Sequence, residues 1–303
     1  MKQMKILITG ASGFLAQYLR NDLYNQGHEL ILLSRQPLPQ PLRIRETAIT
    51  CDLSNSEQTK KALDNQRVDM LFHCASQQPR PNATFDDYFH GNVSTLNNVL
   101  TSIPLHQGFK CVLFSSAVVY GHIRHQVIDE NTPTTPQNTY ALTKLFGENL
   151  LKMLSEQHSF TGFCFRLPSL VGAKQPGGLI HTYSAIAQKN EPLEIYSKGV
   201  LKRNIMLFED VSRLALQTLH TPTNPGYQLY LLGSENSLTL AEIAQYILKK
   251  LDSSSQIHLS DTPSPVEVDW DFNLKKAKKD LQFNPRGLED SIDQFLNEAA
   301  LHE

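Results

Sequence analysis

Tyr140 and Lys144 lie four residues apart in the segment QNTYALTKLFGENLLKML, which covers residues 137–154. Apolar residues recur there at helical spacing and predict an amphipathic helix over residues 140–157. Residues i and i+4 share one face of a helix, so the phenol and the ammonium are neighbours. A phenol with a pKa of about 10 is a poor base at neutral pH. A cation one turn away favours the phenolate and lowers that pKa, which suits proton transfer on a substrate oxygen. The same pair is also compatible with a solvated helix edge.

Charge balance and cysteine spacing indicate the class of protein. The chain has 28 lysines and arginines against 30 aspartates and glutamates, so no net field favours nucleic acid or an anionic membrane. No apolar run approaches the roughly 20 residues that span a bilayer, and the N-terminal MKQMKILITG enters a strand pattern without a signal segment. The cysteines are far apart in or beside apolar stretches, which indicates buried, reduced thiols: Cys51, Cys74, Cys111 and Cys164. We therefore expect a soluble cytoplasmic protein that binds neither nucleic acid nor a membrane.

Short β-rich runs alternate with helical patterns over the first part of the chain. Strands are predicted at residues 5–9, 29–34, 47–52, 70–75, 111–116 and 162–167, and helices at 14–25, 56–65, 85–102 and 140–157. Nearly every position in these strands is apolar, which indicates a parallel sheet covered on both faces. After Val171 the pattern becomes irregular, with short helices predicted at 179–188, 210–220 and 239–251.

These patterns predict an α/β fold, a Rossmann-type doubly wound parallel sheet with a smaller mixed α/β C-terminal lobe. We expect a dinucleotide-binding domain at residues 1–170 plus about 204–235, and a substrate-binding lobe at about 171–203 and 236–303. The crevice at the carboxyl ends of the strands is then the default site.

Gly10 and Gly13 directly follow the first predicted strand and open the first predicted helix, in LITGASGFLAQYL. A pyrophosphate reaches backbone N–H groups and a helix N-terminus only where no side chain blocks the approach. Glycines in this strand–turn–helix context predict dinucleotide binding. A tight turn that needs two glycines would give the same pattern.

The end of the second predicted strand bears on the cofactor's ribose. An acidic residue there would accept hydrogen bonds from the ribose hydroxyls of NAD, but this chain has Ser34 and Arg35, and no carboxylate before Glu46. A hydroxyl and a guanidinium suit a 2′-phosphate. We expect NADP to be preferred over NAD, although an exposed arginine without a ligand would look the same. Asp52 and Leu53, after the third strand, are placed to touch the adenine.

Motifs along nearly the whole chain resemble those of the extended short-chain dehydrogenase/reductase family, in its nucleotide-sugar epimerase, dehydratase and ketoreductase branch. The motifs are GASGFLA at residues 10–16, FHCASQ at 72–77, GNVSTLNNVL at 91–100, FSSAVVYG at 114–121, YALTK at 140–144, RLPSLVG at 166–172 and PLEIYSKGVLKRNIMLFEDV at 192–211. Ala16 replaces the third glycine of the family's glycine motif, which should tighten helix–strand packing without blocking the phosphates.

The resemblance implies catalytic roles for Ser116, Tyr140 and Lys144. Tyr140 is implied as the acid/base, Lys144 as the cation that lowers its pKa and holds the nicotinamide ribose, and Ser116 as a hydroxyl on the same substrate oxygen. Ser116 fits the motif better than Ser115, which strand alternation turns into the sheet. Asn92 is implied to brace the site.

The resemblance also implies two sets of binding residues. The cofactor set is Gly10, Ser12, Gly13, Phe14, Leu15, Ser34, Arg35, Asp52, Leu53, Cys74, Ala75, Ser76, Asn92, Tyr140, Lys144, Leu167 and Ser169. The substrate set is Gln77, Ser116, Val118, Tyr140, Ser169 and Arg203.

The residues after Ser116 reduce the number of reactions that this chain is expected to catalyse. Dehydratases of the branch carry an Asp-Glu pair there, whereas this chain has Ala117 and Val118, so 4,6-dehydration is not expected. No second Tyr or Cys acid/base pair can be located, which disfavours epimerisation at C3 and C5. A 4-keto-6-deoxy nucleotide-sugar reductase and a UDP-glucose 4-epimerase-like enzyme remain. Ser34 and Arg35 favour the reductase, because NADPH is the usual exchangeable reductant.

Two positions do not determine which class of substrate the chain binds. Ser169 stands where sugar-nucleotide enzymes of the family often carry asparagine, and Arg203, which matches an arginine on the substrate diphosphate, could instead form a surface salt bridge. A small carbonyl reductase is therefore an alternative. A non-catalytic NADP sensor is another, although such relatives typically lose the Tyr–Lys pair. Dimers are common in the family through helices matching residues 85–102 and 140–157, so a homodimer is expected.

Neither the histidines nor a basic run predicts a further site. His73, His90, His122, His125 and His181 show no ligand spacing, and a hydride mechanism needs no metal. The basic segment NLKKAKKDLQFNP at residues 273–285 resembles the family's last surface helix, so we read it as a solvated face.

Overall fold

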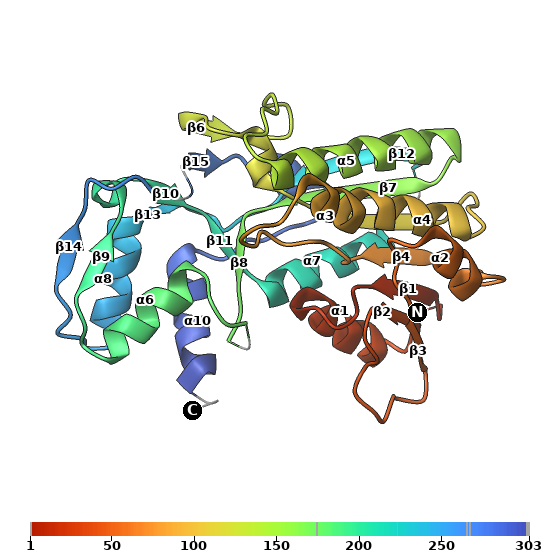
Figure 1. The fold of residues 1–303 in the computed structure, drawn as a ribbon, viewed down its shortest axis with the longest axis horizontal. Helices are drawn as coiled ribbons and strands as arrows, with labels where there is room; N and C mark the ends of the chain where they lie inside the picture. The colour runs from red at the N-terminus through yellow and green to blue at the C-terminus, as the bar shows by residue number, and fades with distance from the viewer. Residues whose placement is uncertain (1, 174, 223, 265, 267, 301–303) are drawn as a thin grey trace. The chain divides into compact units, whose positions relative to one another are not determined.

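The computed structural model describes residues 2–173, 175–222, 224–264, 266 and 268–300. They form two compact units, whose helices and strands are labelled in Figure 1. The first unit consists of the residues up to Val119, Pro136–Arg166 and Ser212–Tyr230, and the second of Tyr120–Thr135, Leu167–Val211 and the residues from Leu231 onward. The division into a dinucleotide-binding domain and a substrate-binding lobe stays a prediction, because compactness alone does not report what each part binds.

A seven-stranded sheet forms the centre of the first unit, in the order β12-β7-β5-β4-β1-β2-β3. Its strands are β1 (Lys5–Thr9), β2 (Glu29–Ser34), β3 (Glu46–Thr50), β4 (Met70–His73), β5 (Lys110–Ser116), β7 (Thr161–Leu167) and β12 (Gly226–Leu231). β1 pairs with β2 and β4, β2 with β3, and β4 with β5, always in parallel. The strand order reverses at β1 and β4, and doubly wound folds bind their ligands at the carboxyl ends of such strands. The predicted Rossmann-type fold is confirmed.

The helices of the sheet unit follow the predicted ranges closely. They are α1 (Phe14–Asn25), α2 (Ser56–Leu63), α3 (Phe85–Phe89), α4 (Thr95–Ser102), α5 (Thr139–Gln157) and α7 (Phe208–His220). α3 and α4 are joined without a break by a π-helical segment, η1 (His90–Ser94). Hydrophobic periodicity predicts this run as one helix and cannot reveal the π segment. Such segments often occur at functional sites.

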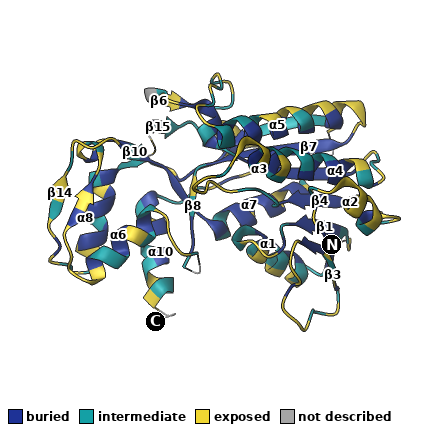
Figure 2. Ribbon diagram, viewed as in Figure 1, coloured by how far each residue is buried: buried dark blue, intermediate teal, exposed yellow. Residues whose placement is uncertain are grey.

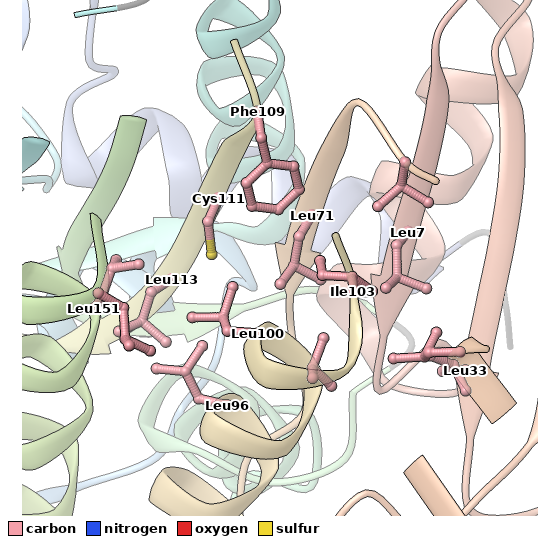
Figure 3. Close-up of a cluster of buried hydrophobic side chains, with 14 of the residues drawn as sticks. Leu7, Leu33, Leu71, Leu96, Leu100, Ile103, Phe109, Cys111, Leu113 and Leu151 are labelled. Atoms are coloured by element: carbon pink, nitrogen blue, oxygen red, sulfur yellow. The ribbon is translucent and has the colours of Figure 1, made fainter. Parts of the chain in front are cut away.

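Apolar side chains between the sheet and its helices form the core of the first unit (Figure 3). Side chains that are at most 1% exposed meet there from β1, β4, β5, α4 and α5: Leu7, Leu71, Cys111, Leu96, Leu100 and Leu151. Full burial of a leucine side chain contributes about 1.5–3 kcal/mol to folding. Figure 2 shows β1 and β4 as buried strands, which explains why their sequences are apolar at nearly every position.

The second unit is built from short paired strands and from helices. β8 (Ser169–Val171) pairs with β11 (Ile205–Leu207), β9 (Leu193–Ile195) with β14 (Ile257–Leu259) and β6 (Arg124–Ile128) with β15 (Asp269–Phe272), all in parallel, whereas β10 (Lys202–Arg203) and β13 (Leu238–Thr239) are antiparallel. Its helices are α6 (Leu179–Gln188), α8 (Leu240–Lys250), α9 (Lys275–Asp280) and α10 (Leu288–Ala300). A second core lies around Ile180, Ile243 and Ile292. These strands of two to five residues carry too little periodicity to be read from sequence.

Candidate active site

Tyr140 and Lys144 lie in the first two turns of α5. The helix begins where the side chain of Asn138 accepts a hydrogen bond from the Ala141 N–H, which satisfies one of the free donors of the first turn. The Lys144 Nζ atom is 5.8 Å from the centroid of the Tyr140 ring. It donates to the carbonyl oxygen of Phe114 on β5 at 2.8 Å. Lys144 is buried, so the pair is not a solvated helix edge.

Ser115 and Ser116, at the end of β5, point to different partners, as strand alternation requires. Ser115 is buried and donates its hydroxyl to the Glu148 carboxylate on α5. Ser116 is half-buried, and its hydroxyl is close enough to the Tyr140 phenol to lower the pKa of that phenol. The structure therefore brings Ser116, Tyr140 and Lys144 together, while Ser115 serves the helix contact. Their catalytic roles stay a prediction.

The protonation of the Tyr140–Lys144 pair follows from burial. Burial raises the pKa of the Tyr140 phenol, and the nearby Ser116 hydroxyl offsets this in part. Burial lowers the pKa of Lys144 to about 8, although Cys164, Glu148 and Cys74 act in the opposite direction. Near neutral pH the protein by itself holds a neutral phenol beside a mostly protonated amine. A phenol in that state is a proton donor, which is what carbonyl reduction needs.

Asn92 joins the segment after β4 to the helix that carries Tyr140. It is buried within the π-helical segment, and its Oδ1 accepts hydrogen bonds from Ser76 Oγ at 2.8 Å and from the Gln77 N–H at 2.9 Å. Its Nδ2 donates to Thr143 Oγ1 at 3.0 Å. Thr143 lies between Tyr140 and Lys144, so the amide fixes their helix against the β4 edge. Sequence reasoning named Asn92, Ser76 and Gln77 but not Thr143.

His73 is a buried structural group rather than a ligand. Its Nδ1 lies 3.0 Å from Thr9 Oγ1, and its Nε2 lies 3.4 Å from Thr95 Oγ1. Burial lowers the pKa of His73 to about 3, and the nearby Lys144 charge acts in the same direction, so the ring is neutral. Thr9 Oγ1 also accepts from the Ala75 N–H at 3.2 Å. These contacts tie β1 to β4 at the switch point.

The Gly10–Gly13 turn leaves an open helix N-terminus at the end of β1. Gly13 is the N-cap of α1 and has no side chain to bond the first free N–H groups, whereas α2 and α5 are capped by Asn55 and Asn138. Ser12 and Gly13 are exposed, and Phe14 and Leu15 are half-buried behind them. The positive end of a helix without a side-chain cap fits a pyrophosphate. The residues present therefore fit a dinucleotide.

Gly10 has a second constraint that the sequence does not reveal. Its φ is +62°, and a Cβ atom built on it would lie 2.7 Å from the Ala75 backbone nitrogen. The glycine thus allows β1 to approach the chain after β4. Cys74 and Ala75, both predicted to wall the cofactor, are half-buried at this contact.

Arg35 lies just after β2, exposed, and makes no hydrogen bond or ion pair with any residue that the structure describes. Ser34 is buried and donates its hydroxyl to the Gln36 carbonyl oxygen at 2.6 Å. Its lone pairs remain as acceptors, so Arg35 is the stronger candidate for a phosphate. Asp52, predicted near the adenine, is exposed and accepts from the N–H and hydroxyl of Ser54, and Leu53 beside it is buried.

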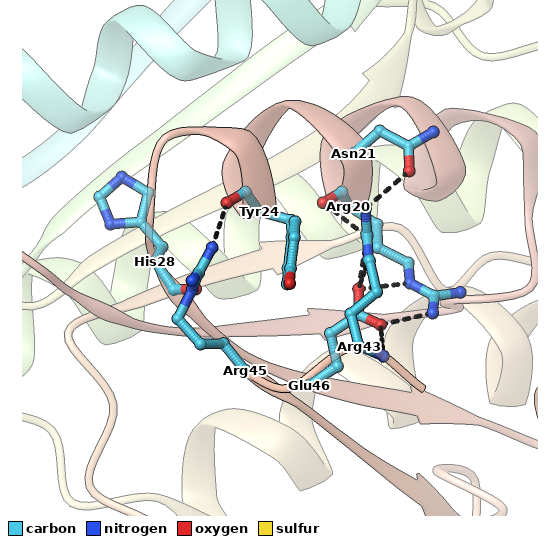
Figure 4. Close-up of polar contacts among 7 residues, drawn as sticks. All are labelled: Arg20, Asn21, Tyr24, His28, Arg43, Arg45 and Glu46. Atoms are coloured by element: carbon cyan, nitrogen blue, oxygen red, sulfur yellow. Dashed lines mark hydrogen bonds and ion pairs between the residues drawn. The ribbon is translucent and has the colours of Figure 1, made fainter. Parts of the chain in front are cut away.

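Glu46 cannot substitute for an acidic ribose ligand, because it lies at the start of β3, opposite Leu30 near the start of β2. Figure 4 shows its carboxylate bound by Arg20 and Arg43, with Tyr24 between Arg43 and Arg45. Burial would raise the pKa of Glu46, but the hydrogen bonds from Arg20 and Arg43 lower it to about 2. The carboxylate is a structural anion at the amino ends of the strands.

Leu167, Ser169 and Arg203 lie in the second unit and are described within it. Leu167 is buried and Ser169 is exposed. Arg203 is buried, and its guanidinium donates to the carbonyl oxygens of Lys202, Val266 and Val268 and to Ser264 Oγ. It is therefore not a surface salt bridge. Contact with a diphosphate stays a prediction and would require some of these hydrogen bonds to be exchanged.

Two negative findings concern the part of the chain that the structure describes. No helix there is long and apolar enough to cross a membrane. No group of three or more His, Cys, Asp or Glu side chains there is arranged to hold a metal ion, and the side chain of His125 lies outside the described residues.

Besides Thr143, sequence reasoning missed two charged residues of this region, Glu148 and Arg166. The two are 3% and 5% exposed and form an ion pair of 2.7 Å behind the catalytic candidates. A signal existed: Glu148 is four residues after Lys144 on the same helix face, and Arg166 stands in the apolar strand GFCFRL. A charge inside an apolar run needs a buried partner.

Comparison with known proteins gives consistent results. Residues 6–233 match the NAD dependent epimerase/dehydratase family. The chain is 25% identical over 305 residues to a Bacillus subtilis (strain 168) protein, the uncharacterized UDP-glucose epimerase YtcB, and the match covers 93% of both chains. It is 23% identical to a dTDP-4-dehydro-6-deoxy-D-allose reductase of Streptomyces sp, covering 98% of this chain and 97% of the reductase.

A solved structure shares the fold. MoeE5 in complex with UDP-glucuronic acid and NAD matches with a TM-score of 0.85 at 22% identity, covering 99% of this chain and 100% of MoeE5. At this identity the likeness shows the fold alone.

Proposed function

Because this chain belongs to the NAD dependent epimerase/dehydratase family, we propose that it transfers a hydride at C4 of a nucleotide-activated sugar. The reaction we propose is the NADPH-dependent reduction of a 4-keto-6-deoxy nucleotide sugar. The observation that carries this proposal is the cluster of Ser116, Tyr140 and Lys144, which unites the hydroxyl, phenol and ammonium that carbonyl reduction requires. Ala117 and Val118 follow Ser116 and cannot move a proton, so the same site does not support dehydration.

The chain's own residues account for the proton. When bound, the nicotinamide of NADPH would supply the hydride to the C4 carbonyl carbon. Tyr140 donates its phenolic proton to the carbonyl oxygen as that oxygen gains negative charge, and Ser116 donates a hydrogen bond to the same oxygen. Lys144 then stabilises the phenolate that remains. Asn92 and Thr143 hold the helix so that these groups keep their spacing.

The substrate and cofactor can be tested together. A 4-keto-6-deoxy nucleotide sugar is incubated with NADPH, and stoichiometric loss of NADPH with one reduced sugar supports the reductase. The relative named as an uncharacterized UDP-glucose epimerase favours a 4-epimerase as second candidate. In that case UDP-glucose is interconverted with its C4 epimer without net cofactor loss. Reduction of small ketones alone would indicate a small carbonyl reductase. Saturable NADP binding without any turnover would indicate a non-catalytic sensor.

NADP preference depends on Arg35 in our proposal. Arg35→Ala should weaken NADP binding about 10–100-fold, because a charge-assisted hydrogen bond to a phosphate contributes roughly 1.5–3 kcal/mol, and should leave NAD binding nearly unchanged. Titration calorimetry with both dinucleotides measures this. Arg67→Ala is the control, since Arg67 is also exposed but precedes β4 at its amino end. Tighter NAD than NADP binding by the wild type would contradict the assignment.

We also propose a homodimer formed by α3 and α5. These helices leave large apolar side chains exposed in the first unit: Phe85 at 46%, Phe146 at 39% and Met153 at 54%. Phe146, Leu150 and Met153 are spaced to form one stripe on α5. Replacing both Phe146 and Met153 with lysine should halve the mass measured by analytical ultracentrifugation. Val200→Lys, at an exposed position of the second unit, should not. A wild-type monomer at micromolar concentration would refute the proposal.

A cytoplasmic location is part of the same proposal. The four cysteines are free and buried or half-buried, as expected of reduced thiols in a reducing compartment.

A further inference from the structure

Consecutive residues of β5 hold two oppositely charged side chains of α5, Lys144 and Glu148. The carbonyl oxygen of Phe114 accepts from Lys144 Nζ at 2.8 Å, and the hydroxyl of the next residue, Ser115, donates to the Glu148 carboxylate. Glu148 follows Lys144 by one helical turn, so both side chains lie on the face of α5 that contacts the sheet. These two contacts with β5 place the Glu148 carboxylate and the proposed catalytic ammonium of Lys144 in one buried layer.

The Glu148 carboxylate is also fixed from β7, which lies beside α5 in Figure 1. Arg166 Nη2 donates to Glu148 Oε2 at 2.7 Å, and Arg166 Nε lies 3.1 Å from Oε1 and 3.2 Å from Oε2. Such a two-point contact fixes the orientation of the carboxylate. Buried ion pairs of this kind add little stability over apolar replacements, so stability is a weak reason for its presence.

The other titratable groups around Lys144, Glu148 and Arg166 are neutral near pH 7. Burial raises the pKa of the Cys74 and Cys164 thiols and of the Tyr227 phenol, and burial lowers the pKa of His73. Burial likewise keeps Tyr140 protonated. The charges in this layer are therefore Lys144 and Arg166, both positive, and Glu148, which is the negative charge among the groups named.

We propose that Glu148 is a positioning residue that keeps Lys144 charged in the working enzyme, by cancelling Arg166 and by lying one turn from the ammonium. This inference rests on the proposed role of Lys144. Without the carboxylate, two buried cations would share the layer, and Lys144 is the one that can release its proton, because arginine cannot. A neutral lysine would no longer stabilise the Tyr140 phenolate.

Glu148→Gln tests the proposal with little change in shape, because the amide can still accept from Arg166 through its oxygen. The pKa of Lys144, about 8 in the wild type, should fall by roughly one unit or more, because a negative charge one helical turn away is removed. The charged lysine is present below its pKa and lost as pH rises through it. The basic limb of kcat/KM against pH for reduction should therefore move to lower pH, with roughly fivefold less activity or lower at pH 8 and little change at pH 6.

A double variant separates charge from structure. Glu148→Gln with Arg166→Met removes one charge of each sign, so the Lys144 pKa and the basic limb should return toward wild-type values although the ion pair is gone. Neutral replacement of a buried pair is often tolerated, so this variant should fold even where the single one does not. Glu46→Gln is the matched control: it also removes a buried carboxylate, in this case one held by Arg20 and Arg43, and it should lower stability without moving the limb.

Lys144 is titrated directly by NMR of lysine labelled at Cε, with Lys144→Met to assign the signal. This measurement needs no turnover. An unmoved Lys144 titration in Glu148→Gln, or an equal fall in the double variant, would refute the inference even in an active enzyme. A wild type that turns over no sugar nucleotide would instead refute the proposed function, whatever the titration shows.

Discussion

Tyr140→Phe should lower kcat/KM for reduction of a 4-keto nucleotide sugar about 1000-fold, within the usual range for loss of a general acid. The variant keeps the ring, and so it keeps the edge contact with Tyr88, whose centroid is 6.0 Å away. It removes only the hydroxyl that lies near Ser116 and that would protonate the carbonyl oxygen. The measurement is steady-state kinetics with NADPH, together with cofactor binding by fluorescence, which should be nearly unchanged.

Tyr88→Phe is the matched control for this variant. It removes a neighbouring phenolic hydroxyl that accepts a hydrogen bond from the Arg80 N–H at 3.4 Å and has no proposed contact with substrate. Its kcat/KM should stay within about threefold of the wild type, since a lost neutral hydrogen bond contributes only about 0.5–1.5 kcal/mol to stability. Substantial activity in Tyr140→Phe, or an equal loss in both variants, would remove Tyr140 from its role.

The sheet unit was predictable because its local signals agree with one another. The apolar run at residues 5–9 and the glycines that follow it predicted β1 and α1 at the residues where the structure has them. The strand predicted at 70–75 ends earlier, at His73, because the Ala75 N–H bonds the Thr9 hydroxyl rather than a neighbouring strand. β12 was missed: most of its residues are only half-buried, so its sequence lacks the continuous apolar run of a central strand.

The candidate site likewise contains residues that the sequence could name and contacts that it could not. Ser116, Tyr140 and Lys144 belong to short motifs whose spacing carries the chemistry, so sequence alone could name them. The Glu148–Arg166 pair joins α5 to β7, and periodicity on one element does not identify a partner on another. Ser34 shows the opposite case, because its residue type suggested a phosphate ligand while its proton is used by the Gln36 carbonyl. Residue types give candidates, and tertiary contacts decide which atoms are available.

Gly10→Ala and Gly13→Ala should separate two reasons for glycine in the loop after β1. At Gly10 a Cβ atom would lie 2.7 Å from the Ala75 nitrogen and 2.9 Å from the Cys74 carbonyl carbon, and both are backbone atoms that cannot rotate away. The φ of +62° adds a left-handed conformation that costs an alanine about 1–2 kcal/mol. Together with overpacking of about 1–3 kcal/mol, Gly10→Ala should lower the free energy of unfolding by roughly 3 kcal/mol.

Gly13→Ala should behave differently, because its φ is −74° and its Cβ would meet only the Gly10 carbonyl oxygen, at 3.1 Å. A shift of a few tenths of an ångström relieves that contact, so the free energy of unfolding should change by less than about 1 kcal/mol. The new methyl group would instead stand at the exposed N-terminus of α1, where a pyrophosphate would approach, and should weaken dinucleotide binding about tenfold or more. Urea unfolding and dinucleotide titration of both variants measure the two effects. Equal loss of stability in the two would show that the β1–β4 contact does not depend on Gly10, and unchanged dinucleotide affinity in Gly13→Ala would place the phosphates elsewhere.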